Sequence, residues 1–247
     1  MKSATKRRWQ LGLSYFVMIS LVSAIIYIIV AMVKAPKQPI FDQPYRRTKS
    51  EYVLMLLQCT LGVVAMMLPS ILKKRAKLEI PSKMMIFYTI FLYCAIYLGE
   101  VRAFYYNVPH WDTILHTFSG AMLGALGFSF INFLNNTDRV PIYLSPLFVV
   151  TFAFCFAVTL GVFWEIYEFT ADGILYTNMQ KYALENGTLL IGRNALADTM
   201  KDLTVDIIGA FVMSVVGYIS LKYKKGWVES LLLHMPRRSQ SEKQFTK

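Results

Sequence analysis

Hydrophobic residues dominate six long stretches of this chain, and short polar segments separate them. A helix needs about 20 apolar residues to cross a hydrocarbon core of about 30 Å. Because unpaired backbone polar groups are costly in lipid, we expect all six stretches to form transmembrane helices. They cover residues 10–33, 52–72, 84–101, 112–134, 142–166 and 203–221.

The composition supports this interpretation. The 247 residues are 55% hydrophobic and 15% aromatic, which is too apolar for an ordinary soluble domain. A transmembrane β-barrel would need short alternating segments, and the sequence has none. We therefore predict an all-α, polytopic membrane protein with a bundle of about six helices. Residues 1–247 form a single integral membrane domain, and residues 222–247 form its basic cytoplasmic tail.

The net charge of +11 raises the question of a nucleic-acid partner. The basic residues, however, form short runs beside apolar segments, a pattern typical of membrane flanks, so we expect the partner to be the lipid bilayer and not nucleic acid. With the N-terminus inside, the inner segments hold 17 lysines and arginines and the outer segments hold 9. This bias predicts that both termini are cytoplasmic.

Acidic residues gather at the helix ends on one side of the predicted membrane. Successive spans alternate in direction, so the end of the third, the start of the fourth, the end of the fifth and the start of the sixth share one side. Nine of the 15 acidic residues lie at these ends or in the loop between the last two spans: Glu100, Asp112, Glu165, Glu168, Asp172, Glu185, Asp198, Asp202 and Asp206.

The spacing of these residues places them on single helix faces. Asp112 and His116 are four residues apart, and Glu165 and Glu168 are three apart. Asp198 and Asp112 could simply cap helix starts. Asp202 lies deeper in its span, where an acidic group costs on the order of 3 kcal/mol. The candidate catalytic residues are Asp112, His116, Glu165, Glu168, Asp198 and Asp202.

Carboxylates that share a site repel one another, and a divalent cation would relieve that repulsion. Histidine with carboxylates from facing helices suits Zn, Mn or Fe. We expect His116, Glu165, Glu168 and Asp202 to be the metal ligands, with Asp112 orienting His116. The alternative is a salt-bridged, hydrated polar plug without a metal.

Small residues at four-residue spacing let membrane helices approach closely. Gly120 and Gly124 have this spacing in the fourth span, and Gly209 and Gly217 repeat it over two turns in the sixth. We therefore expect these two spans to be neighbours, which would bring His116 toward Asp202.

Three sequence blocks resemble the YjdF-like family of uncharacterised bacterial inner-membrane proteins. They are Asp112, His116 and Gly120; then Trp164, Glu165 and Glu168; then Asp198, Thr199, Asp202, Gly209 and Ala210. The order of the blocks is also similar, more distantly, to the VanZ-like proteins linked to glycopeptide resistance. The resemblance implies a multi-pass protein of the bacterial inner membrane.

Three function classes remain open at this stage. The first is a metal-dependent enzyme that acts on a lipid or lipid-linked substrate at the outer leaflet. The second is a cation- or proton-coupled transporter, although transporter sites usually lie near the membrane midplane between repeats. The third is a non-catalytic membrane scaffold. No GxSxG, Walker or HExxH motif supports serine, nucleotide or zincin chemistry.

Overall fold

The computed structural model describes residues 2–37, 47–75, 77–135, 144–184 and 188–233. Within these ranges the secondary structure is mainly helical, with loops and turns between the helices and an isolated bridge between Ala183 and Leu189. Six helical segments are long and apolar enough to cross a membrane, which confirms the predicted fold class. They are α1 (Lys2–Lys34), α2 (Lys49–Arg75), α3 with η1 (Ser82–Leu92 and Tyr93–Val101), α5 (Trp111–Asn135), α6 (Pro146–Leu175) and α7 (Arg193–Lys222). The short elements are α4 (Phe104–Asn107) and η2 (Glu229–Leu231).

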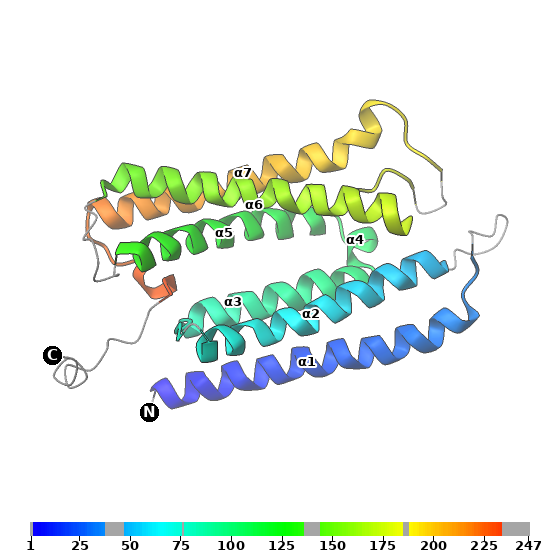
Figure 1. The fold of residues 1–247 in the computed structure, drawn as a ribbon, viewed down its shortest axis with the longest axis horizontal. Coiled ribbons are helices and arrows are strands. Elements are labelled where there is room, and N and C mark those ends of the chain that lie inside the picture. The colour runs from blue at the N-terminus through cyan, green and yellow to red at the C-terminus, as the bar shows by residue number, and fades with distance from the viewer. Residues whose placement is uncertain (1, 38–46, 76, 136–143, 185–187, 234–247) are drawn as a thin grey trace.

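The helices form two groups of three (Figure 1). In the first group, α1 packs on α2, α3 and η1; in the second, α5, α6 and α7 contact one another pairwise. The groups touch where η1 meets α4 and α5, and where α3 meets η2. Phe118 of α5 also reaches across to stack on Phe91 of α3, with ring centroids 6.1 Å apart.

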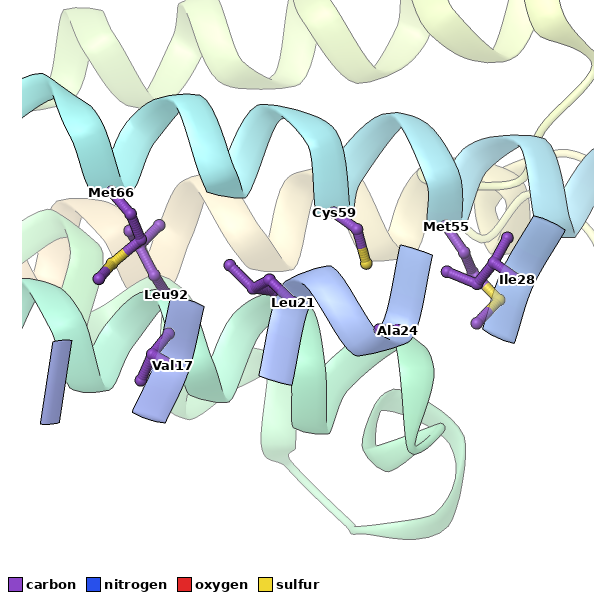
Figure 2. Close-up of a cluster of buried hydrophobic side chains, with 8 residues drawn as sticks. All are labelled: Val17, Leu21, Ala24, Ile28, Met55, Cys59, Met66 and Leu92. Atoms are coloured by element: carbon purple, nitrogen blue, oxygen red, sulfur yellow. The ribbon is translucent and has the colours of Figure 1, made fainter. Parts of the chain in front are cut away.

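The first group is held together by an apolar core. Val17, Leu21, Ala24 and Ile28 recur along one face of α1, and each is almost fully buried. Figure 2 shows these side chains directed toward α2 and α3, where they meet Met55, Cys59, Met66 and Leu92. This core is apolar and serves as the scaffold of the group. Glu100, near the end of η1, lies within electrostatic range of Asp112, so the group also places one acidic residue close to the candidate site.

The buried face of α6 changes character along its length. It begins with Val149, Ala153, Ala157 and Gly161, at intervals of four residues, and continues on the same face with buried carboxylates. The proline after Ser145 and the Ser145 hydroxyl, which accepts a hydrogen bond from the Phe148 amide at 3.2 Å, start this helix. The same face of α6 thus packs against α5 and α7 in its first half and lines the acidic site in its second half.

The helix bounds differ from the sequence expectation most around the connection between α6 and α7. Helix α6 continues to Leu175 and α7 starts at Arg193, so the connection is much shorter than the one expected between the predicted spans 142–166 and 203–221. Asp198 consequently lies in the second turn of α7 and is not its N-cap; that position belongs to Gly192, whose φ of +62° favours glycine. The third span ends as the π-helix η1, which periodicity did not predict.

Candidate acidic and histidine site

Helices α5 and α7 approach each other so closely that only glycine fits at two contact points. A Cβ on Gly209 would lie 2.0 Å from the carbonyl oxygen of Thr117, and one on Gly120 would lie 2.3 Å from that of Asp206. These contacts confirm that the fourth and sixth spans are neighbours. They also fix the turn of α5 that carries His116 against the turns of α7 that carry the aspartates.

His116 lies among carboxylates from its own helix and from α7. Its Nε2 atom is 3.7 Å from Oδ1 of Asp112, one turn earlier on α5, and 3.9 Å from Oδ2 of Asp202. On the other side of the ring, Nδ1 is 3.3 Å from Oδ2 of Asp206. The Ser119 hydroxyl donates to the second oxygen of Asp206 at 3.0 Å. The imidazole is therefore held between carboxylates on both of its nitrogens.

A single group of potential metal ligands emerges among the described residues. One donor atom from each of Asp112, His116 and Asp202 lies within 4.8 Å of the other two. Asp202 is only 2% exposed, and its Oδ1 meets no hydrogen-bond partner within the described part of the chain. Donors on one four-coordinate zinc ion lie roughly 3.4 Å apart, given bonds of about 2.1 Å. Small side-chain movements would thus bring these donors onto one ion.

Lys181, on the loop between α6 and α7, inserts its ammonium into the same site. It forms an ion pair with Oδ2 of Asp112, and it lies 3.3 Å from both carboxylate oxygens of Asp198. Its ammonium also lies over the Tyr105 ring, 5.6 Å from the centroid. Burial lowers the pKa of Lys181, but the carboxylates of Asp112 and Asp198 outweigh that effect and raise its pKa above the ordinary value. Lys181 therefore stays charged.

Tyr105 belongs to α4, which contacts both η1 of the first helix group and α5 of the second. It therefore lies where the two groups meet. Its ring packs on Gly99, where a Cβ would come within 2.4 Å of the tyrosine Cε2. Burial, followed by the nearby carboxylates of Glu100 and Asp112, raises the pKa of the Tyr105 phenol well above its ordinary value. The phenol therefore remains neutral beside the acidic residues.

Helix α6 contributes two buried glutamates. Trp164 Nε1 donates to Glu168 Oε1 at 2.9 Å, which fixes that carboxylate. Neither carboxylate oxygen of Glu165 meets a hydrogen-bond partner among the described residues, although Glu165 is only 4% exposed. The nearby Gln180 side chain donates to the carbonyl oxygen of Glu165, at 3.4 Å, and not to its carboxylate. Both glutamates lie within electrostatic range of His116.

Asp172 organises the loop that carries Lys181. One of its carboxylate oxygens accepts from the Thr177 hydroxyl at 2.6 Å and from the Met179 amide at 2.8 Å; the other accepts from the Gln180 amide at 3.0 Å. A carboxylate has about four acceptor positions, and these three hydrogen bonds occupy three of those on Asp172. Asp172 serves the loop and lies outside the donor group formed with His116.

The structure brings together the α5 and α7 members of the predicted site. Asp112, His116 and Asp202 form the donor group, and Asp198 joins them through Lys181. Glu165 and Glu168, which we also expected as ligands, lie nearby but outside that group. Glu185 lies outside the described residues.

The sequence placed Asp206 on the same helix face as Asp198 and Asp202, but we did not count it among the site residues, and we gave no role to Lys181 or Tyr105. The spacing of Asp206 from Asp202, four residues on the same helix, was a usable signal for Asp206. Lys181 and Tyr105 reach the site through the connections between the long helices, where no periodic spacing marks them in the sequence.

A shallow apolar groove adjoins the site. It measures about 420 Å³ and is lined by α5 and α7, including Thr113, Thr117, Ala121 and Gly209. Thr113 and Thr117 directly follow Asp112 and His116 along α5. The groove therefore starts at the same turns of α5 as the acidic site and is lined by uncharged residues of two membrane-spanning helices.

These features define a six-span helical membrane protein with an acidic and histidine site at one end of its second helix group. The chain belongs to the family of predicted membrane proteins called DUF2238, whose model matches residues 16–223. That range contains every residue of the donor group and the loop that carries Lys181.

The chain is also similar to a bacterial protein. An uncharacterised protein from Thermotoga maritima is 31% identical over 153 residues, which cover 61% of this chain and 69% of the relative. No solved structure matches the chain. The finer resemblance to YjdF-like and VanZ-like proteins stays a prediction, since neither match bears on it.

Proposed function

We propose that this protein is a metal-dependent enzyme of the bacterial inner membrane that acts on a lipid or lipid-linked substrate at the outer face. The observation that carries the proposal is the donor group of Asp112, His116 and Asp202, with Asp206 behind the imidazole. The bound ion would be Zn, Mn or Fe, which accept mixed imidazole and carboxylate ligands.

The two ring nitrogens of His116 support separate roles. A proton on Nδ1 satisfies the contact to Asp206, and it leaves the Nε2 lone pair directed toward Asp112 and Asp202. Metal-binding histidines nearly always donate their second N–H to a carboxylate or carbonyl group in this way. Asp206 therefore takes the orienting role that sequence reasoning gave to Asp112, and Asp112 becomes a ligand.

Charge supports a bound cation. Five aspartates and glutamates on α5, α6 and α7 surround His116, whereas Lys181 is the one lysine or arginine with an ion pair to the donor group in the described part of the chain. Carboxylates in a shared site repel one another, and either a bound cation or a proton on one of them relieves the repulsion. This deficit of positive charge favours an ion over the alternative of a salt-bridged polar plug.

Glu165 supplies the proton-transfer group in this proposal. Its carboxylate is buried beside His116 and has no hydrogen-bond partner among the described residues. A bound ion would activate water or polarise a phosphoryl oxygen, and a carboxylate near that ion could accept the proton. Glu168, fixed by Trp164, and Asp198, paired with Lys181, would shape the site around it.

The position of the site supports a lipid or lipid-linked substrate. The donor group lies in the first half of α5 and of α7, toward the ends of the spans that we expect to face outward, and the apolar groove between α5 and α7 starts at the same turns of α5. A headgroup at the site and a hydrocarbon chain along the groove would match this arrangement. A transporter site, by contrast, usually lies nearer the membrane centre.

The test is the metal content of the purified protein, measured by inductively coupled plasma mass spectrometry after exchange into metal-free buffer and reloading. We expect the parent to retain one or more Zn, Mn or Fe ions per chain. His116→Ala and Asp202→Asn should each lower the affinity by at least about tenfold, because each removes a ligand.

His110→Ala is the matched control, since His110 is an exposed histidine just outside α5 and does not belong to the donor group. It should retain the metal. A parent that binds no metal, or variants that bind it as the parent does, would contradict the proposal. Metal binding accompanied by cation flux in reconstituted vesicles would instead support a transporter.

A further inference from the structure

A positive charge from the protein itself already occupies part of the acidic site. The Lys181 ammonium pairs with Asp112, a proposed ligand, and with Asp198. Asp112 is therefore shared, with one oxygen facing Lys181 and the other facing His116. An ion that binds both carboxylate oxygens of Asp112, or that draws the Asp112 carboxylate toward Asp202, must compete with the Lys181 ammonium.

The loop that carries Lys181 is built to hold the ammonium there. Besides the three hydrogen bonds to Asp172, the Gln180 side chain donates to the Thr199 hydroxyl at 3.0 Å, which ties the loop to α7. Lys181 itself has a φ of +48°, in the left-handed region that favours glycine. The residue adopts this costly conformation at the position that directs its side chain to Asp112 and Asp198.

Lys181 also keeps an alternative location. Its side chain is 27% exposed, more than those of Asp112 and Asp198, and its partner Asp198 does not belong to the donor group. The ammonium can therefore leave Asp112 and remain paired with Asp198. A long, flexible lysine side chain permits that shift without movement of the backbone.

We propose that Lys181 is a tethered competitor for Asp112, which makes the site selective for divalent over monovalent cations. This inference rests on the proposed metal binding at Asp112, His116 and Asp202. A monovalent ion that displaces the ammonium exchanges one unit charge for another and gains no charge attraction. A divalent ion adds a second charge among the same carboxylates and gains attraction. Lys181 is thus a specificity-determining residue of the site.

Three variants test this role. Lys181→Gln removes the charge and retains a polar side chain, whereas Lys181→Arg keeps the charge. Lys201→Gln is the matched control: Lys201 is exposed, lies one turn from Asp198 and interacts with it electrostatically, yet it makes no ion pair with the donor group. Titration calorimetry with Mn²⁺, at low and at high potassium concentration, gives the affinity of each purified variant.

Lys181→Gln should bind Mn²⁺ about tenfold more tightly than the parent at low potassium, since a close competing charge is gone. High potassium should weaken Mn²⁺ binding to this variant by several fold more than it weakens binding to the parent. Lys181→Arg should behave as the parent, and Lys201→Gln should change the affinity by less than about twofold.

A second measurement detects, in the unmodified protein, whether Mn²⁺ displaces the Lys181 ammonium from Asp112. Amine acylation followed by mass spectrometry should label Lys181 more slowly than Lys201, and Mn²⁺ should increase the labelling of Lys181 alone. If the parent binds Mn²⁺ but Lys181→Gln binds it no more tightly, the inference is wrong and the metal site stands. If neither binds Mn²⁺, the metal site itself is wrong.

Discussion

Asp206 is the residue whose position most clearly separates a metal site from a simple acidic cluster. It contacts the nitrogen of His116 that faces away from the donor group, and the Ser119 hydroxyl holds its other oxygen. A cluster formed only by helix capping would not need a carboxylate at this depth, two turns beyond Asp198 on α7. The geometry matches the carboxylate and histidine pairs that position metal ligands.

Substitution of Asp206 should weaken metal binding without removing a ligand. Asp206→Ala should lower the metal affinity by about 10- to 100-fold, the range typical of such supporting residues. Asp206→Asn should have a smaller effect, because its amide oxygen can still accept from Nδ1. Ser119→Ala keeps the carboxylate and removes only one hydrogen bond to it, so its effect should be the smallest of the three. Equal affinities across the series, measured by calorimetry, would contradict the role of Asp206.

At the scale of elements, the close contact between α5 and α7 determines whether the donor group forms. The two glycines that permit it, Gly120 and Gly209, meet backbone atoms of the facing helix, which cannot rotate away as a side chain could. Larger residues would therefore separate the helices. His116 and Asp202 lie on opposite sides of this contact, so separation would also open the site.

Gly209→Ala should consequently reduce both stability and metal affinity. The added methyl group would lie 2.0 Å from the Thr117 oxygen, and overpacking of this kind costs about 1–3 kcal/mol. Thermal unfolding in detergent and Mn²⁺ titration would measure the two effects. Gly173→Ala, at a position in α6 where a Cβ meets nothing within 4 Å, is the control; it should leave the affinity unchanged and should not lower the stability, since alanine favours the helix more than glycine does. A stable Gly209→Ala protein with unchanged affinity would argue against this coupling.

The sequence predicts the helices well because apolar length and small-residue spacing are local properties. It predicts less of the site. Helix α7 starts ten residues before the predicted span because its first turns are polar and lie beyond the apolar run. Lys181 reaches the site through a positive φ and through the Asp172 contacts, which join residues five to eight positions apart in a loop without periodicity.

The π-helix at the end of the third span was also beyond sequence reasoning. Nothing in Tyr93–Val101 distinguishes it from an ordinary apolar helix. Tertiary contacts accompany it: Arg47 donates to the carbonyl oxygens of Glu100 and Val101, both at 3.2 Å, and Trp111 donates to that of Cys94 at 3.3 Å. Such π segments are frequent at functional sites, and this one ends beside Tyr105.

At the scale of the whole molecule, the two described ends of the chain lie at one end of the bundle (Figure 1). The acidic site lies in the halves of α5, α6 and α7 that are toward the opposite end. An even number of spans requires the first of these relationships. The excess of lysine and arginine on the side of the termini then predicts that the site faces outward.

Membrane-impermeant maleimide labelling of single-cysteine variants would check this orientation. In a background without Cys59, Cys94 and Cys155, Ile191→Cys, at an 85% exposed position beside α7, should label in intact spheroplasts. Lys225→Cys, at the opposite end, should label only after permeabilisation. The reverse pattern would place the site in the cytoplasm and exclude an outer-leaflet substrate.

The grouping of the spans as three plus three has a mechanical consequence. The first group has three spans, an odd number, so the chain leaves this group on the membrane side opposite to its start. Residues 102–110 then connect the two groups on the side of the acidic residues. That link contains Tyr105 and leads directly into Asp112. A tilt of one trio of helices against the other would therefore act on this link as well as on the contact between α3 and η2, and the distance between Tyr105 and Lys181 would report the movement at the site.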